Sequence, residues 1–357
     1  MPPLATLGWD DAWAQAFAPF AADGLVPGRV ARENRGIHRV LTETGEVVAS
    51  AAGRLRLEAR GRIDLPAVGD WVALRAETAT VRAVVQGVVP RRSAFVRRAA
   101  GEGTTEQVVA ANVDSVLLVS GLDHDFNPRR IERYVLLAWE SGARPVVVLN
   151  KADLRDDVEE CRRAIEQVAP GVDVLAVSAR DPPSLAVLHP YLAPGRTVAL
   201  LGSSGVGKST LLNRLLGSEV QPTRAVRARD QRGRHTTTER HLFVLPGGAL
   251  AIDTPGMREL QLWEAGGGLE ATFDDVESLA ARCRFRDCGH GSEPGCAVQA
   301  AVAEGSLPRD RLDSFHKLRG ELRHLQRKQD ERVLAEDNRK VRAVHKAARK
   351  HLSLIHI

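Results

Sequence analysis

The sequence predicts a multidomain protein with an N-terminal β-barrel, a central α/β domain and a mostly helical C-terminal domain. Three observations support this fold class. Short, partly alternating apolar runs fill residues 36–103, unbroken Val/Leu runs alternate with helical stretches over 104–264, and a Cys/His cluster followed by charged helix occupies 265–357. A chain of 357 residues is long enough for two or three domains. Residues 1–35 are expected to form an N-terminal extension with a short helix near Asp11–Phe20.

Composition favours a cytoplasmic protein. No stretch approaches the roughly 18 apolar residues that a membrane-spanning helix needs. The start, MPPLATLGW, lacks a basic segment followed by an apolar run, so no secretory signal is expected. Four cysteines in a chain of this length do not suggest a disulfide framework, and clustered cysteines in a reducing compartment more often bind metal.

Five runs predict the strands of the barrel, and Gly, Pro and acidic turns separate them. They are GIHRVLTE, GEVVASAAG, RLRLEARG, DWVALRAE and ATVRAVVQGVVPR, all within 36–103. Five short strands in about 65 residues suit an OB barrel. An SH3-like barrel is the alternative, because periodicity does not separate the two.

Six apolar runs predict the central sheet, at 113–120, 145–150, 172–178, 197–202, 241–246 and 249–253. Unbroken Val/Leu runs are typical of strands buried on both faces. Helices are expected between them at 128–141, 155–168, 184–192 and 208–216. This alternation predicts a doubly wound parallel sheet that binds its ligand at the carboxyl ends of the strands. PGG joins the last two runs, which indicates a hairpin and one antiparallel edge strand.

The segment GSSGVGKS fits the phosphate-binding motif G-x-x-x-x-G-K-[ST], between a predicted strand and a predicted helix. Its glycines let successive backbone N–H groups point at phosphate oxygens, and the helix presents its N-terminus to the anion. Lys208 is expected to bridge the β- and γ-phosphates, and Ser209 to ligate Mg²⁺. The expected phosphate-binding residues are Gly202, Ser203, Ser204, Gly205, Val206, Gly207, Lys208, Ser209 and Thr210.

NKAD, at Asn150, Lys151, Ala152 and Asp153, follows a predicted strand. The Asp153 carboxylate can accept both N1–H and the exocyclic amine of guanine, a pair of donors that adenine lacks. Asn150 is expected to hold neighbouring loops and bind the base, while Lys151 packs along the ring. Ser178 and Ala179, after the next strand, are expected to offer a backbone N–H to the guanine oxygen. Together these residues predict a GTP site rather than an ATP site.

DTPG, from Asp253 to Gly256, ends the last predicted strand and fits D-x-x-G. Asp253 would hold Mg²⁺ through water, and the Gly256 N–H would contact the γ-phosphate. GRHTTT (233–238) lies in a polar segment that is either a GTP-ordered switch or a plain solvated loop. Met257 stands where many GTPases place a water-orienting glutamine, so intrinsic hydrolysis should be slow. His235 could orient the water, and a solvated loop histidine is the alternative.

The guanine motif precedes the phosphate loop in this chain, so the motifs are circularly permuted. Each βα unit keeps its own chemistry, because the ligand contacts lie at strand ends. The last switch motif therefore leads almost directly into the C-terminal domain.

Cys283, Cys288, His290 and Cys296 lie within fourteen residues. Three thiolates and one imidazole suit tetrahedral Zn²⁺, and four protein ligands indicate one structural zinc site. Cys161 is expected to be a core or surface thiol instead of a ligand.

Positive charge is concentrated in two flanking segments. From Arg32 to Arg98 there are thirteen Arg, no Lys and seven Asp or Glu; from Ser306 to Ile357 there are fourteen Lys or Arg and seven acids. Two basic flanks suggest a polyanionic partner, and solvated faces are the alternative.

Over residues 36–320 the chain resembles the circularly permuted GTPase family that acts in maturation of the small ribosomal subunit, RsgA, also called YjeQ. The barrel, NKAD, SA, GSSGVGKS, GRHTTT, DTPG and the pattern Cys-x4-Cys-x-His-x5-Cys carry the resemblance. It implies that Thr237 is the switch residue on Mg²⁺, that both flanking domains contact rRNA, and that the small subunit stimulates GTP hydrolysis. The roles of residues 1–35, of the basic tail and of the terminal LSLIHI stay open.

These inferences predict a monomeric cytosolic GTPase that binds the small ribosomal subunit late in its assembly. An RNA-binding scaffold with a structural nucleotide site is one alternative. A GTPase of a protein or metal-delivery pathway, whose basic flanks only aid solubility, is the other.

Overall fold

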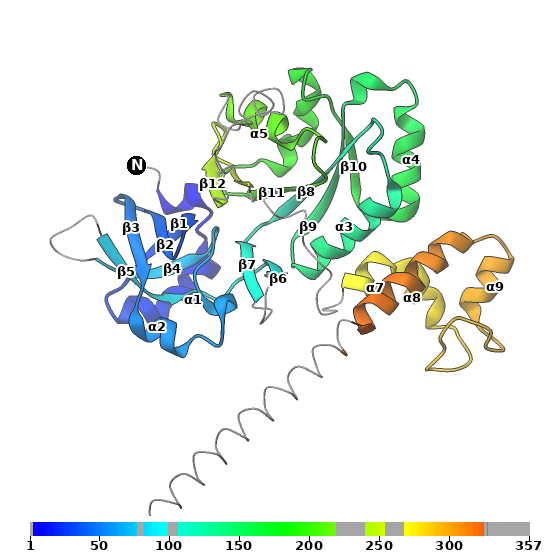
Figure 1. Ribbon diagram of the computed structural model, residues 1–357, viewed down its shortest axis with the longest axis horizontal. Coiled ribbons are helices and arrows are strands. Elements are labelled where there is room, and N and C mark those ends of the chain that lie inside the picture. Colours follow the sequence, from blue (N-terminus) through cyan, green and yellow to red (C-terminus); the bar gives the residue numbers. More distant parts are fainter. Residues whose placement is uncertain are drawn as a thin grey trace, which may run out of the picture. The chain divides into compact units, whose positions relative to one another are not determined.

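The computed structural model describes residues 3–76, 82–98, 106–218, 240–253, 268–324 and 327. They fall into two compact units. The first comprises the chain to Gln261 together with Glu270–Thr272, and the second comprises the rest of the C-terminal part. The barrel and the α/β sheet both belong to the first unit (Figure 1). Within the described ranges, no helix has both the length and the apolar character that crossing a membrane requires.

The barrel is closed by five strands. These are β1 (Val26–Asn34), β2 (Ile37–Thr42), β3 (Gly45–Ala51), β4 (Trp71–Ala76) and β5 (Arg82–Val88). They pair in the order β1-β2-β3-β5-β4, and β4 returns to β1. The β3–β5 pair is parallel and the others are antiparallel. This arrangement is that of an OB barrel, so the OB prediction is confirmed and the SH3-like alternative is wrong.

Two details of the predicted barrel are wrong. Its first strand begins at Val26, inside the segment assigned to an N-terminal extension, so the barrel does not start at residue 36. The run RLRLE is not a strand but helix α2 (Gly53–Glu58). An Arg54–Glu58 ion pair four residues apart supports that helix, and Leu57 is 88% exposed. The alternation of Arg and Leu resembles that of a strand, but Leu57 is exposed and Leu55 is only half-buried.

The predicted N-terminal helix is present as α1 (Asp11–Ala22), after a short 3₁₀ turn, η1 (Leu4–Leu7). Asp10 caps α1 by accepting a hydrogen bond from the Trp13 backbone N–H. Trp13 and Phe17 of this helix are buried. The Trp9 ring meets the fully buried Trp71 of the barrel edge to face, with 4.6 Å between centroids. The N-terminal segment is therefore part of the barrel's core.

Arg29 joins three parts of the first unit. Its buried guanidinium donates hydrogen bonds to the carbonyl oxygens of Leu7, Gly69 and Asn112 and to Thr197 Oγ1. Burial lowers the pKa of Arg29 to about 10, and the nearby carboxylates of Asp114 and Asp70 oppose that shift. The side chain stays charged at neutral pH and links the N-terminal turn, the barrel and the α/β sheet.

A hairpin of β6 (Ala94–Arg98) and β7 (Glu106–Ala111) connects the barrel to the α/β sheet. The sheet that follows has the strand order β10-β9-β8-β11-β13-β12. All of its pairs are parallel except β12–β13. Its strands are β8 (Ser115–Gly121), β9 (Arg144–Asn150), β10 (Asp173–Ala176), β11 (Thr197–Leu201), β12 (Arg240–Val244) and β13 (Leu250–Asp253).

Helices cover both faces of this sheet. Alternate residues of β8 and β11, such as Leu117 and Leu200, pack with Leu211 and Leu188 in one apolar core. That core lies under α5 (Lys208–Leu216) and η4 (Pro182–Tyr191). Helices α3 (Pro128–Glu140) and α4 (Val158–Val168) lie over β8, β9 and β10 (Figure 1). The predicted doubly wound sheet is confirmed, although the segment expected to be an α-helix at 184–192 is a 3₁₀ helix.

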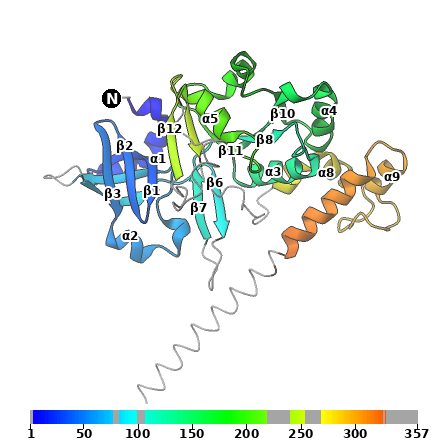
Figure 2. The same cartoon turned by 45° about the horizontal axis from the view of Figure 1, so that its top comes forward.

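The antiparallel strand β12 is not an edge strand as predicted. Its free side pairs with β1 of the barrel, with Arg32 opposite His241 and Glu33 opposite Arg240. Figure 2 shows β12 between the α/β sheet and the barrel. The barrel and the α/β sheet therefore form one continuous hydrogen-bonded sheet of eleven strands among the residues described.

The second unit is helical. It contains the start of α7 (Gly268–Thr272), whose last three residues group with the first unit, followed by α8 (Asp274–Ala280), α9 (Ala297–Ala303) and a helix over 309–324. Phe273, Val276 and Phe315 are fully buried, and the Phe273 and Phe315 rings meet at 5.4 Å. Residues 281–296, between α8 and α9, contain no helix or strand and carry the Cys/His cluster.

Candidate functional site

The motif residues meet at one edge of the α/β sheet. Strands β9, β8, β11 and β13 are neighbours and run parallel, so their carboxyl ends lie together. Asn150 ends β9, the phosphate loop follows β11, and Asp253 ends β13. Ser178 lies two residues beyond the end of β10, the next strand outward. The permuted chain order therefore still gathers these motifs at one place.

The phosphate loop needs glycine at two positions for steric reasons. Gly202 and Gly207 have φ values of 155° and 99°, which L-residues with a side chain rarely adopt. A Cβ atom on Gly202 would lie 2.1 Å from the Val119 carbonyl oxygen, and one on Gly207 would lie 2.3 Å from Asn150 Nδ2. Any larger residue would push the loop away from the sheet or from Asn150.

Helix α5 begins directly after this loop. Lys208 is its first residue, and Ser209 and Thr210 follow in the first turn. The Lys208 ammonium donates to the carbonyl oxygens of Gly202 and Ser203 at 2.6 and 2.5 Å, so the side chain folds back across the loop. The α5 N-terminus and this ammonium give the loop a positive potential suited to phosphate.

Asn150 joins the three loops of the site. Its side chain is buried, with 1% exposed. Nδ2 donates to the Val206 carbonyl oxygen at 2.8 Å, and Oδ1 accepts from the Ala179 backbone N–H at 3.0 Å. Asn150 therefore holds neighbouring loops as expected. The Ala179 N–H that was expected for the guanine oxygen is bonded to Asn150 in this structure.

Lys151 makes a second link between the guanine motif and the phosphate loop. It has a left-handed backbone conformation, with φ of 65°. Its ammonium donates to the Gly205 carbonyl oxygen at 2.8 Å and pairs with Asp123. Burial raises the pKa of Asp123, but hydrogen bonds from Lys151 and from the Asp125 backbone more than offset this, so the net shift is downward.

Asp153 faces a cavity of about 220 Å³ between the guanine motif and the phosphate loop. Ser178 Oγ donates to Asp153 Oδ1 at 2.6 Å, and Arg180 Nη1 lies 4.0 Å from the other carboxylate oxygen. Ser178 thus fixes the orientation of the carboxylate. Gly207 and Thr210, which flank Lys208 and Ser209 in the chain, line the other side of the same cavity.

Three predicted site residues lie outside the described residues. His235 and Thr237 belong to the segment 219–239, and Gly256 belongs to 254–267. Met257 lies in the second of these segments as well. Asp253, which begins the D-x-x-G motif, is described and half-buried at the end of β13.

Sequence reasoning missed two residues of this site. Asp123 is paired with Lys151, and Arg180 lines the cavity. An acidic residue two positions after strand β8, on the sheet edge that binds ligand, was an available signal for Asp123. No motif pointed to Arg180, whose place depends on the loop after β10.

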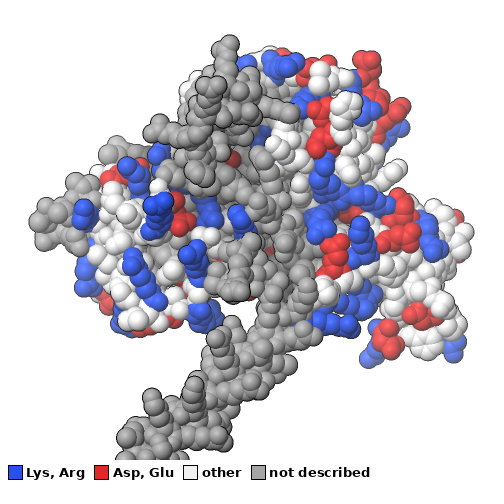
Figure 3. Space-filling view, viewed as in Figure 1, with Lys and Arg blue, Asp and Glu red and all other residues white. Residues whose placement is uncertain are grey.

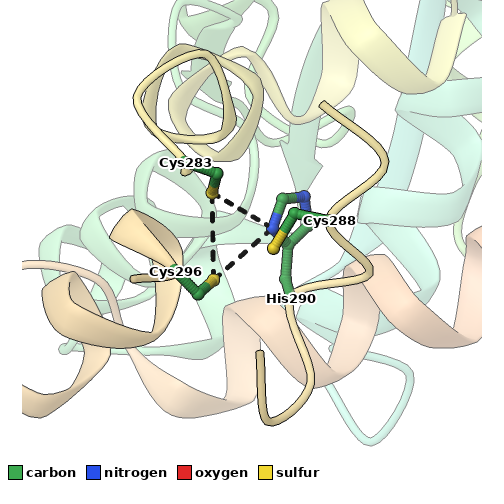
Figure 4. Close-up of side chains that lie close together, drawn as sticks. All are labelled: Cys283, Cys288, His290 and Cys296. Atoms are coloured by element: carbon green, nitrogen blue, oxygen red, sulfur yellow. Dashed lines mark hydrogen bonds between the residues drawn. The ribbon is translucent and has the colours of Figure 1, made fainter. Parts of the chain in front are cut away.

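The Cys/His cluster forms a second site, in the second unit. The side chains of Cys283, Cys288, His290 and Cys296 point toward one another (Figure 4). Cys283 Sγ lies 3.7 Å from His290 Nδ1 and 3.9 Å from Cys296 Sγ, and Cys296 Sγ lies 3.7 Å from the same ring nitrogen. All four ligand atoms lie within 4.8 Å of one another.

Neighbouring polar groups hold the ligands in place. The Glu293 carboxylate accepts from the backbone N–H groups of Gly289 and Gly291, on either side of His290. His290 has a left-handed backbone, with φ of 61°, and its carbonyl oxygen accepts from Gln299 Nε2 at 2.7 Å. This strained histidine conformation is held by the loop and by α9.

The geometry fits a metal ion with four ligands. A tetrahedron with metal–sulfur bonds of ~2.3 Å has sulfur–sulfur edges of ~3.8 Å. The observed separations of 3.7 to 3.9 Å between three of the atoms are close to that edge. The donor set of three thiols and one imidazole, all but Cys283 buried, is therefore able to hold a metal ion.

Comparison with known proteins gives consistent results. Residues 88–263 match the RsgA GTPase family model. A small ribosomal subunit biogenesis GTPase RsgA from Opitutus terrae is 51% identical over 336 residues, which are 92% of this chain and 92% of that protein. The crystal structure of YjeQ from Thermotoga maritima covers 84% of this chain and 98% of that chain, with a TM-score of 0.64 and 27% identity.

A second solved structure, that of the circularly permuted GTPase YloQ, covers 84% of this chain and 96% of that chain, with a TM-score of 0.62 and 26% identity. In this chain the guanine motif precedes the phosphate loop, and both lie at one edge of the sheet. The chain therefore belongs to the RsgA family of circularly permuted small ribosomal subunit biogenesis GTPases.

Proposed function

We propose that this GTPase binds the small ribosomal subunit late in its maturation and leaves it after hydrolysing GTP to GDP and phosphate. The observation that carries the proposal is the hydrogen bond from Asn150 Nδ2 to the Val206 carbonyl oxygen. It fixes the guanine motif against the phosphate loop around one cavity. A relative that is 51% identical is named a small ribosomal subunit biogenesis GTPase.

Guanine is recognised by Asp153 in this proposal. Its carboxylate, oriented by Ser178, accepts from N1–H and from the exocyclic amine of the base. Asn150 and Lys151 supply the wall of the base pocket, and the backbone at Ser178 and Ala179 faces the guanine oxygen. The Ala179 backbone N–H already donates to Asn150 Oδ1, so a hydrogen bond to the guanine oxygen would share this one N–H between two acceptors.

Asp153→Asn should lose most of its preference for GTP. Hydrogen bonds to a charged group contribute about 1.5–3 kcal/mol, so GTP affinity should fall about ten- to a hundredfold. An amide can instead accept from N1–H and donate to the second carbonyl of xanthine, so xanthosine triphosphate should bind better to Asp153→Asn than to the original chain. Nucleotide titrations followed by calorimetry measure both changes.

The matched control is Asp157→Asn, four residues further along and paired with Arg155 at the surface. It should bind GTP as the original chain does. Unchanged selectivity of Asp153→Asn between GTP and xanthosine triphosphate would remove Asp153 from the base site.

The triphosphate is held by the loop from Gly202 to Thr210. In the proposal Lys208 bridges the β- and γ-phosphates, and the Gly256 N–H contacts the γ-phosphate. Mg²⁺ would be held by Ser209 and Thr237, and by Asp253 through water, and would neutralise phosphate charge. Ser209 lies just after the loop that follows β11, and Asp253 ends β13; these two strands are paired and parallel, which supports the assignment of both residues to one metal ion.

Hydrolysis requires an oriented water molecule. The thioether of Met257 is only a weak hydrogen-bond acceptor and cannot orient a water as glutamine does, so turnover by the protein alone should be slow. We assign Thr237, Lys208 and His235 to the catalytic machinery, with His235 as the residue that orients water. The small subunit would then accelerate the reaction by positioning His235 and Thr237 against the nucleotide.

The flanking parts would bind the ribosome and maintain the fold. The basic barrel and tail are proposed to contact rRNA phosphates, and one structural Zn²⁺ is proposed for Cys283, Cys288, His290 and Cys296. The protein would act as a cytoplasmic monomer.

Hydrolysis should rise at least about tenfold when purified small subunits are added, because Met257 cannot take the place of a water-orienting glutamine and the subunit would help to position the attacking water. Subunit affinity should also be higher with a non-hydrolysable GTP analogue than with GDP. Phosphate release and subunit co-sedimentation measure the two effects. Equal affinities in both nucleotide states would favour an RNA-binding scaffold, and a rate unchanged by subunits would favour a GTPase of another pathway.

A further inference from the structure

A second cavity lies in the barrel, far along the chain from the nucleotide motifs. It has a volume of about 490 Å³. Its walls come from the β1–β2 turn, from α2 and the 3₁₀ turn η2 (Arg62–Asp64), and from β7. We call it the barrel cavity. Arg35, Arg56 and Arg62 line it, together with the buried His38.

The three arginines of the barrel cavity differ from their neighbours in having no partner. Among the residues that the structure describes, the side chains of Arg35, Arg56 and Arg62 form no ion pair and no hydrogen bond. Three nearby arginines are paired: Arg39 with Glu46, Arg54 with Glu58, and Arg60 with Asp64, at 2.5, 2.7 and 3.0 Å. The one acid of the cavity wall, Glu33, is held by Arg240 at 3.1 Å. Positive charge is therefore left uncompensated in the cavity (Figure 3 shows basic side chains spread over the barrel).

His38 is the second unusual feature of the cavity. Its side chain is on β2, only 3% of the residue is exposed, and Nδ1 has no hydrogen-bond partner. Burial, followed by the nearby Arg56, lowers the pKa of His38 to about 4, so the ring is neutral at pH 7. Leaving a buried polar atom unpaired costs about 1–3 kcal/mol, so a polar ligand that reaches this ring would recover part of that cost.

We propose that the barrel cavity binds a phosphate group of single-stranded RNA, held by Arg56 and Arg62 with Arg35 at the rim and His38 at the base. This inference rests on the proposed function, because it says where the barrel meets RNA. Guanidinium groups suit phosphate because their N–H groups form paired, charge-assisted hydrogen bonds with two oxygens. A neutral imidazole can add one further N–H donor. The cavity is also larger than the nucleotide cavity, which leaves room for the sugar next to the phosphate.

The test compares two double variants that remove the same charge. Arg56→Gln with Arg62→Gln changes the cavity, whereas Arg54→Gln with Arg60→Gln changes the paired neighbours on the same segment. The probes are a labelled single-stranded RNA of about 12 nucleotides and the purified small subunit. The cavity pair should weaken RNA binding about tenfold or more and lower the salt slope by ~0.7, the value for one phosphate contact on a single strand. The control pair should stay within about threefold of the original chain.

His38→Leu separates binding from stability. If the ring donates to RNA, this variant should bind RNA several-fold more weakly while its melting temperature stays the same or rises, because the unpaired nitrogen is gone. Competition with millimolar inorganic phosphate separates the two phosphate sources. Displacement of the RNA by phosphate at that concentration would make this a site for the free ion and overturn the assignment to RNA.

Equal losses in the two double variants would also overturn the proposal, because they would show only a general effect of charge. The RNA assay needs no GTP hydrolysis, so it can fail or succeed independently of the proposed function. If small subunits do not stimulate hydrolysis by the original chain, but the cavity variants lose RNA binding, the proposed function is wrong and the RNA site stands. If small subunits stimulate hydrolysis, but the cavity variants bind RNA as the original chain does, the proposed function stands and the RNA site is wrong.

Discussion

Lys208→Ala should abolish measurable GTP binding and hydrolysis while the first unit stays folded. The ammonium is placed at the first residue of α5 and reaches across the phosphate loop to the carbonyl oxygens of Gly202 and Ser203. A lysine that bridges two phosphates makes at least two charge-assisted hydrogen bonds, each about 1.5–3 kcal/mol. Losing both should weaken GTP about a thousandfold. Titration with a fluorescent GTP analogue measures the loss.

Two control variants show whether the charge or its position matters. Lys317→Ala makes the same substitution at an exposed site of the second unit and should leave GTP affinity unchanged. Lys208→Arg keeps the charge, but a planar, longer guanidinium does not replace a compact ammonium inside a closed loop. It should therefore restore little binding. Tight GTP binding by Lys208→Ala, with an unchanged melting curve, would contradict the phosphate assignment.

The α/β sheet was the most predictable part of the molecule. Runs such as PVVVLN and TVALLG are apolar without a break because both faces of their strands are covered, and this pattern has few other structural causes. All six predicted strands were found, with shifts of a few residues at their ends. The pairing of β12 with β1 was not predictable, since it depends on a contact between residues about two hundred positions apart.

The barrel was less predictable because one face of each strand lies near solvent. VPGRVAREN, the first strand, contains Pro, Gly and three charged residues, which all argue against a strand. Gly28 is required there because a Cβ atom would lie 2.5 Å from a methyl group of Val40. RLRLE had the better pattern for a strand and became a helix. The local sequence pattern therefore favoured RLRLE over VPGRVAREN as a strand, whereas the structure has the reverse.

At the nucleotide site the sequence predicted which residues gather but not how they contact one another. The motif spacing placed Asn150, Asp153 and Lys208 at strand ends. It did not show that Ser178 Oγ orients the Asp153 carboxylate or that Lys151 pairs with Asp123. Such contacts depend on loop conformations, which motifs restrict only in part.

The strand pairing also bears on how the nucleotide could affect the barrel. Arg240, which begins β12, pairs with Glu33 of β1 and donates to the Val108 carbonyl oxygen and to Gln107 of β7. The segment that contains His235 and Thr237 precedes it directly in the chain. A change in that segment therefore reaches Arg240 directly along the chain and, through the ion pair and hydrogen bonds of Arg240, reaches residues that also line the barrel cavity.

Cys288→Ser should remove the metal ion and unfold the loop that carries the second unit's ligands. Residues 281–296 have no helix or strand, so few backbone hydrogen bonds hold them without a metal ion. Structural zinc sites contribute about 10–16 kcal/mol of apparent binding free energy, as much as a whole domain's net stability. Elemental analysis should give about one zinc per original chain and close to none for Cys288→Ser.

The fourth cysteine supplies a matched control. Cys161 is buried in α4 of the first unit, and its substitution by serine should leave the metal content at one equivalent. GTP binding should persist in Cys288→Ser, because the nucleotide cavity is built wholly from residues of the first unit. A chelator added to the original chain should reproduce the Cys288→Ser melting curve and leave that variant unaffected. Full metal content in Cys288→Ser, or iron in place of zinc in the original chain, would contradict the four-ligand zinc centre that we propose.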